Sequence, residues 1–166
     1  MTDILRLLSI VILLAISISA YFLVVSALFS SRITKVQQTI SQTLARSFWV
    51  GLVNLLFFGV ILLILLTLLD GNRVPDLLRV ILYVPTFVLF ALLAAVLSLG
   101  LAGMVNWLGE RLFADQNAIR RTILGSVTLS FACALPFVGW FLLLPYVGFV
   151  GFGAVILAFV QKENKS

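Results

Sequence analysis

Apolar residues follow one another in long runs along this chain, and short polar stretches separate the runs. A helix needs about 20 predominantly apolar residues to cross the hydrocarbon core of a bilayer. Each of the first three runs is long enough for one crossing. The pattern therefore predicts an all-α integral membrane protein. We expect three transmembrane helices, at about residues 7–29, 48–69 and 77–107.

The last run, residues 123–160, is 38 residues long and carries no charged side chain. That length is too great for one crossing and is roughly enough for two short ones. Helix-breaking residues in its middle predict a hairpin with arms at about 123–143 and 145–160. Two short spans and a re-entrant hairpin both fit this pattern. The breakers are Pro136, Gly139, Pro145 and Gly148.

Composition supports a chain whose main solvent is lipid. Hydrophobic residues make up 63% of the sequence and charged residues 10%, whereas globular proteins have roughly 25% charged residues. We expect a single membrane domain over residues 1–166. The net charge of +5 comes from few basic residues scattered between apolar runs, so it does not indicate a nucleic-acid partner. The first run is longer than the apolar part of a signal peptide and predicts a retained anchor.

Lys and Arg predict the orientation, because positively charged loops stay on the cytoplasmic side. With the N-terminus outside and a returning hairpin, the C-terminus is cytoplasmic. Eight basic residues then lie inside and three outside. A single last crossing would leave a more even split, so the charges favour the hairpin. The inner set is Arg32, Lys35, Arg46, Arg111, Arg120, Arg121, Lys162 and Lys165, and the outer set is Arg6, Arg73 and Arg79.

The polar connection after the first run has a helical pattern of its own. Ile33, Val36, Ile40 and Leu44 recur at spacings of three and four residues, with glutamines and serine on the other face. This predicts a short amphipathic helix at about 32–45 that lies in the membrane interface. A helix that docks on a partner protein is the alternative.

The side chains needed for catalysis are scarce. The sequence has no histidine, which removes the commonest general base and metal ligand. The six acidic residues fall in loops or at segment ends, and Cys133 is the only cysteine. Ion-coupled transporters normally keep charged groups inside the membrane. We therefore expect no enzymatic activity, no cofactor and no metal site.

Several residues predict helix packing. Asn54 is a strongly polar side chain inside a span and predicts a hydrogen bond to a neighbouring helix. Small residues allow close approach of helices in membranes. Proline removes a backbone donor, and a carbonyl freed in this way must be covered by protein. The expected packing residues are Gly51, Asn54, Ala94, Ser98, Ala102, Pro136, Gly139, Pro145, Gly148, Gly151 and Gly153.

The second half of the chain resembles a known membrane region. The residues that carry the resemblance are 46–48 (RSF), 108–112 (LGERL), 135–140 (LPFVGW) and 151–155 (GFGAV). They are similar to the multi-span region that follows the β-helical domain in some bactofilin-type, polymer-forming cytoskeletal proteins. The resemblance covers about residues 46–160, and this chain has no β-helical domain. It implies a membrane module that anchors or gathers other components, without catalysis.

These patterns predict a non-catalytic integral membrane anchor, scaffold or accessory subunit of a larger assembly. The alternative is a small channel or transporter subunit, which would need a polar lumen. We expect membrane lipids and other membrane subunits, or further copies of this chain, as partners. The expected location is a bacterial or archaeal plasma membrane.

Overall fold

The computed structural model describes residues 2–70, 75–135 and 137–160, and these are almost entirely helical. No strand occurs in these three ranges, so the all-α prediction is confirmed. The elements are α1 (Thr2–Leu28), α2 (Ser30–Asp70), α3 (Asp76–Leu112), α4 (Ala118–Ala134), the π-helical η1 (Val138–Leu143) and α5 (Leu144–Val160).

Four stretches within these helices are long and apolar enough to cross a membrane. The chain is thus an integral membrane protein by the length and composition of its helices. The fourth stretch covers both η1 and α5. The four are Ser9–Leu28, Ser30–Leu69, Leu77–Leu112 and Val138–Val160.

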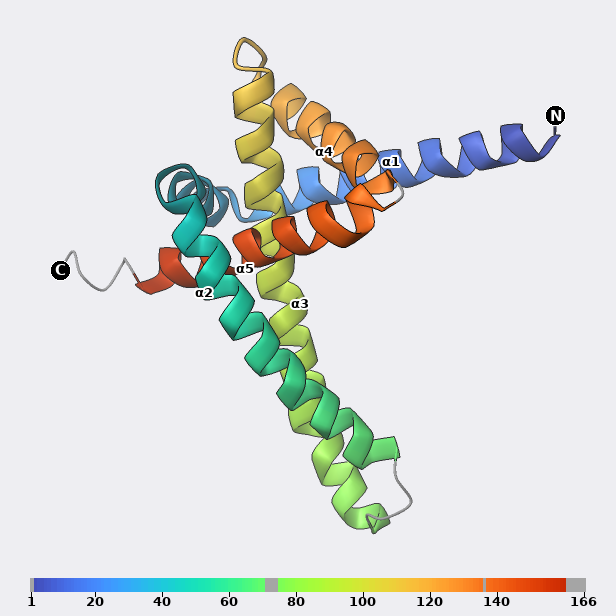
Figure 1. Cartoon of the computed structure of the whole chain (residues 1–166), viewed down its shortest axis with the longest axis vertical. Helices are drawn as coiled ribbons and strands as arrows, with labels where there is room; N and C mark the ends of the chain where they lie inside the picture. Colours follow the sequence, from blue (N-terminus) through green and yellow to red (C-terminus); the bar gives the residue numbers. More distant parts are fainter. Residues whose placement is uncertain (1, 71–74, 136, 161–166) are drawn as a thin grey trace.

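The molecule divides into a packed body and a projecting arm (Figure 1). We define the arm as residues 54–70 of α2 and 76–95 of α3, and the body as the other described residues. In Figure 1 the two arm helices run side by side away from the body, while α1 and α5 cross α3. Leu69 and Leu93 of the arm are buried, but the main cluster of buried apolar side chains lies in the body. Its members are Phe22, Ile33, Val36, Ile40, Ala102, Met104, Val105, Leu129, Val147, Val150, Ala154 and Val155.

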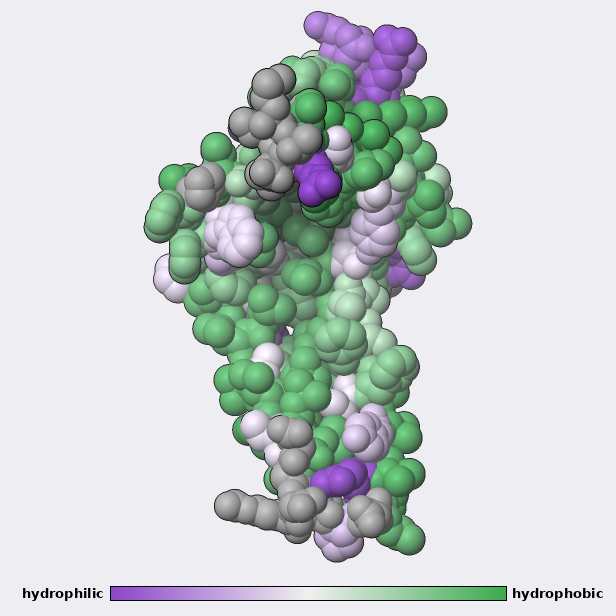
Figure 2. Space-filling model, turned by 90° about the vertical axis from the view of Figure 1, so that its right-hand side faces the viewer, coloured by the Kyte–Doolittle hydropathy of each residue, from purple (hydrophilic) through white to green (hydrophobic). Residues whose placement is uncertain are grey.

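Apolar side chains also cover most of the outer surface. Figure 2 shows apolar residues over both the body and the arm, with hydrophilic residues mainly at the upper end and near the tip of the arm. Leu63 of the arm is 63% exposed and Phe87 is 72% exposed. Such a surface suits lipid as its solvent.

Glycines bring α5 into backbone contact with α2 and α3. A Cβ atom added to Gly153 would lie 1.9 Å from the carbonyl oxygen of Ser47, and one added to Gly51 would lie 1.8 Å from that of Phe149. On the other side of α5, a Cβ on Gly100 would lie 2.3 Å from the carbonyl carbon of Gly151. Only glycine permits these distances.

A second pair of glycines joins α3 to α4. A Cβ on Gly125 would lie 2.4 Å from the carbonyl oxygen of Val105, and one on Gly109 would lie 2.2 Å from that of Arg121. This contact folds α4 back along the end of α3 directly after the short connection at residues 113–117.

The expected amphipathic helix is the first part of α2, and its apolar face is buried in the body. Ile33, Val36 and Ile40 are 2%, 3% and 0% exposed. The face therefore packs on protein and not in the membrane interface, because the end of α3 covers it: a Cβ on Gly103 would meet the Val36 side chain at 2.5 Å. Non-helical backbone angles at Thr43 then kink α2 before it continues as the second span.

The hairpin turns earlier than expected. Leu135 is extended and Phe137 has a φ of 66°, whereas the helix continues without a break through Pro145 and Gly148. The two arms are thus residues 118–134 and 138–160. The π-helical turn just before α5 explains why Pro145 is tolerated, since a wider coil relieves the clash between the proline ring and the preceding turn. Pro136 lies outside the described residues.

Because Gly153 sits on the α2 backbone, Gly153→Ala should lower the free energy of unfolding by about 1–3 kcal/mol, the usual cost of overpacking. Gly59 is the matched control, because a Cβ there meets nothing within 4 Å. Gly59→Ala should be neutral or slightly stabilising, since alanine is the better helix former. Thermal unfolding of both variants in one detergent compares them. Equal stability of the two variants would contradict the close contact.

Candidate functional site

The glycines expected to pack do so to different degrees. Gly51, Gly151 and Gly153 lie against neighbouring backbones. Gly148 has only the Leu97 side chain near its Cβ position, at 3.9 Å. Gly139 fills the hairpin turn, where a Cβ would lie 2.4 Å from the carbonyl oxygen of Cys133. It thereby covers the last carbonyls of α4.

The small-residue stripe of α3 is buried only towards the end of the helix. Ala102 is 0% exposed, Ser98 is half-buried, and Ala94 is exposed. The Ser98 hydroxyl donates to the carbonyl oxygen of Ala94 and accepts a hydrogen bond of 2.7 Å from Tyr21 of α1. The backbone contacts of α3 are made by its glycines and not by this stripe.

Asn54 differs from the expectation. Its amide donates to the carbonyl oxygen of Val50, one turn back in α2, at 2.8 Å. The side chain is half-buried and has its donor satisfied within its own helix. A bond of this kind needs no partner helix.

Asn106 is the amide that does join helices. Its nitrogen donates to the Ser26 hydroxyl of α1 at 3.0 Å, and its oxygen accepts from the Thr122 hydroxyl of α4 at 2.6 Å. A further buried bond of 2.8 Å runs from Ser126 of α4 to Ser19 of α1. The sequence pattern did not single out Asn106. Its position beside Trp107, at the end of an apolar run, was the available signal.

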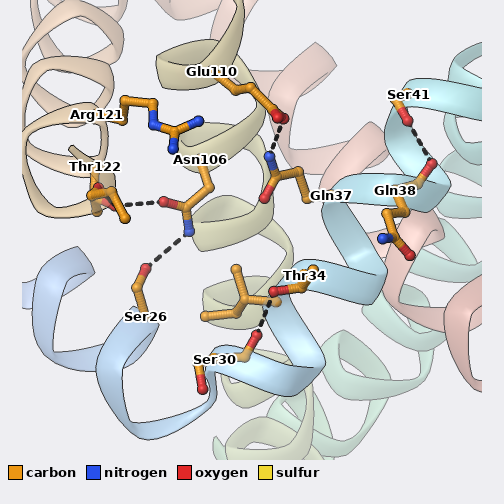
Figure 3. Close-up of a pocket in the computed structure, with 12 residues that line it drawn as sticks. Ser26, Ser30, Thr34, Gln37, Gln38, Ser41, Asn106, Glu110, Arg121 and Thr122 are labelled. Carbon is orange, nitrogen blue, oxygen red and sulfur yellow. Dashed lines mark hydrogen bonds between the residues drawn. The ribbon is translucent and has the colours of Figure 1, made fainter. Parts of the chain in front are cut away.

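The Asn106 hydrogen bonds form the floor of a polar pocket in the body (Figure 3). The pocket has a volume of about 370 Å³ and lies between the end of α1, the start of α2, the end of α3 and the start of α4. Polar and charged side chains supply most of its lining, which is unusual in a chain that is 63% hydrophobic. The lining residues are Ser26, Ser30, Ile33, Thr34, Gln37, Gln38, Ser41, Asn106, Glu110, Ala118, Arg121 and Thr122.

Two opposite charges face this pocket without pairing. The Glu110 carboxylate accepts a hydrogen bond from the Gln37 amide of α2. Arg121 reaches towards the pocket from α4 (Figure 3), and its Nε atom is buried without a hydrogen-bond partner. A buried donor that lacks a partner is costly. The pocket therefore offers a cation and an anion that are both open to further contacts.

Two apolar hollows lie beside the body helices. A groove of about 430 Å³ runs between α1 and α4, from Leu23 and Ile123 at one end towards Phe131. A larger apolar cavity of about 800 Å³ lies between α1, α3, α4 and the η1–α5 helix, where Tyr21, Cys133 and Trp140 line it. Both are suited to hydrocarbon because they contain almost no polar surface.

The side chains of the pocket are suited to binding a polar or charged ligand. Among the described residues no group of three or more metal-ligating side chains comes together. The pocket holds hydroxyls, amides, one carboxylate and one guanidinium. These groups donate and accept hydrogen bonds and hold charged ligands.

Comparison of the chain with protein-family models, with curated proteins and with solved structures finds no match. The likeness to the membrane region of bactofilin-type proteins stays a prediction.

Asn106→Leu should destabilise the fold by about 1–2 kcal/mol, since it removes two hydrogen bonds between helices that each contribute about 0.6 kcal/mol or somewhat more. Asn54→Leu is the control and should cost less, because its bond lies within one helix. Thermal unfolding of the two variants in the same detergent compares them. A larger loss for Asn54→Leu would show that Asn106 does not join the helices in solution.

Proposed function

We propose that this chain is a non-catalytic membrane anchor or accessory subunit, which gathers other membrane components into a larger assembly. The observation that carries the proposal is the arm. Its two helices stand clear of the body, contribute no residue to the main buried cluster, and expose many large apolar side chains.

The dimensions of the arm support a role in the membrane. At 1.5 Å per residue, its 17 residues of α2 and 20 residues of α3 extend about 26 and 30 Å. The hydrocarbon core of a bilayer is about 30 Å thick. A helix that is apolar all round is typical of a membrane span. We therefore expect the arm to cross the bilayer as a hairpin, in addition to the apolar stretches of α1 and of η1 with α5.

The use of polar side chains supports a role in assembly. Outside the pocket, the buried hydroxyls of Ser19 and Ser126 are taken up by bonds within and between helices. Groups fixed in this way hold the body together. They are not free to act on a substrate. The resemblance to a module that anchors other components points to the same role.

The basic residues support an orientation in a bacterial or archaeal plasma membrane. Seven described basic residues lie in the body, and six of these, all except Arg6 of α1, lie on α2, α3 and α4, whereas the described arm carries Arg79 alone. Positive charge marks the cytoplasmic side. The charged end of the body, around the pocket, then faces the inner surface, and the tip of the arm faces the outer one. The six are Arg32, Lys35, Arg46, Arg111, Arg120 and Arg121.

If the arm crosses the membrane, cysteines at its tip and at the far end of the body should be labelled from opposite sides. In a Cys133→Ala background, Leu77→Cys should react with a membrane-impermeant maleimide added outside intact cells. Asn117→Cys should react only after the cells are opened. Labelling of both positions from the same side would show that the arm does not cross.

The assembly role predicts that the arm contacts other membrane proteins. A photo-crosslinking residue in place of Leu63 or Phe87 should give discrete crosslinked proteins in cells, whereas one in place of the buried Val105 should not. The purified chain in liposomes should pass no ions or small solutes. Solute flux through the purified chain would favour the channel alternative. Crosslinks to lipid alone would contradict the assembly role and indicate that the chain is only an anchor.

A further inference from the structure

We propose that the polar pocket binds the headgroup of a phospholipid that carries both a phosphate and a primary ammonium, as phosphatidylethanolamine does. The phosphate would pair with Arg121 and the ammonium with Glu110. This site is a property of the body and does not depend on the role of the arm.

Arg121 supplies the phosphate contact. Arg121 lines the pocket and its guanidinium points towards it (Figure 3), so its N–H groups can donate to a bound acceptor. A guanidinium offers parallel N–H groups that match two oxygens of a phosphate. Ala118, in the first turn of α4, also lines the pocket. The N-cap Asn117 makes no side-chain capping bond, so the start of this helix also favours an anion.

Glu110 supplies the ammonium contact. Its carboxylate is held in place by the Gln37 amide, and a carboxylate has further lone pairs free to accept hydrogen bonds. The Glu110 carboxylate is hydrogen-bonded by Gln37 and forms no ion pair with Arg121. The two opposite charges therefore line the same pocket unpaired. A ligand with one negative and one positive group satisfies both. A primary ammonium donates hydrogen bonds to the carboxylate, and the quaternary ammonium of a choline headgroup cannot.

The surroundings favour a lipid as the source of the headgroup. The apolar groove between α1 and α4 begins within one helical turn of the pocket, since Leu23 precedes Ser26 by three residues and Ile123 follows Thr122 directly. An acyl chain in this groove would lie close to a headgroup in the pocket. The volume of about 370 Å³ is also within the usual range of small-ligand sites.

The test uses the full-length protein in detergent, titrated with phospholipids of identical acyl chains and measured by native mass spectrometry. The probes are phosphatidylethanolamine, phosphatidylcholine and phosphatidylglycerol. Wild-type protein should bind the ethanolamine lipid most tightly. Arg121→Gln should weaken binding of all three by about tenfold or more, the effect expected for the loss of a charged hydrogen bond. Glu110→Gln should weaken only the ethanolamine lipid and so remove the preference.

Arg120→Gln is the matched control. Arg120 is the neighbouring arginine, is exposed outside the pocket, and makes a long contact of 3.5 Å to Gln116. It should bind all three lipids as wild type does. Equal lipid binding by Arg120→Gln and Arg121→Gln would overturn the proposal. Equal binding of the three lipids by wild-type protein would overturn it as well.

Two further measurements distinguish loss of binding from loss of folding, and a lipid ligand from a soluble one. If Arg121→Gln does not fold, Arg121→Lys replaces it and should lose part of the affinity, because lysine keeps the charge without the paired donors. Soluble glycerophosphoethanolamine should compete only at concentrations far above those of the lipid. Competition at equal concentration would show that the pocket takes a free phosphate ester and not a membrane lipid.

Discussion

Lipid tails are as apolar as the side chains that face them, so membrane helices gain little from hiding apolar surface against one another. Association must come from close packing and from hydrogen bonds. In this chain the closest backbone packing converges on α5, whose Gly151 and Gly153 let the backbones of α3 and α2 approach on two sides. Hydrogen bonds join α1, α3 and α4. The main buried cluster forms around α5 and along the contacts of α4 with α1 and α3, and the arm projects beyond both.

The same constraint explains where the polar side chains lie. A polar group inside a membrane protein needs a partner, and serine, threonine and asparagine find theirs across the contacts between α1, α3 and α4. The pocket lies where these contacts end, at the junction of four helices. There Glu110 comes from α3 and Arg121 from α4. The Gln37 amide donates to the Glu110 carboxylate. The polar pocket is a consequence of how the helices are joined, and it offers a ligand both a cation and an anion.

Run length and composition were sufficient to predict the helical class and the presence of helices long and apolar enough to cross a membrane, because bilayer thickness sets this length directly. Glycines at 51, 151 and 153 followed from the same reasoning about close approach. The burial of the first part of α2 could not be predicted in this way. Apolar residues at helical spacing, such as Ile33, Val36 and Ile40, are equally expected on a face that packs on protein and on a face that lies in the membrane interface. Asn54 and Asn106 show the other limit. Both are amides in apolar surroundings, and whether an amide reaches a neighbouring helix depends on which helix packs beside it.

Gly59 shows why the arm and the body call for different explanations. The glycines that join the helices of the body each have a backbone or a side chain close to the position of an added Cβ atom. At Gly59 an added Cβ atom would meet nothing within 4 Å. Within the protein this glycine has no packing role, and glycine in a helix costs about 1 kcal/mol relative to alanine. Its neighbours Phe57 and Val60 are exposed as well. A surface that keeps an unfavourable helix residue where nothing of its own chain approaches is open to close approach by another helix. This is the contact that crosslinking from Leu63 would detect, since Leu63 lies one turn further along α2.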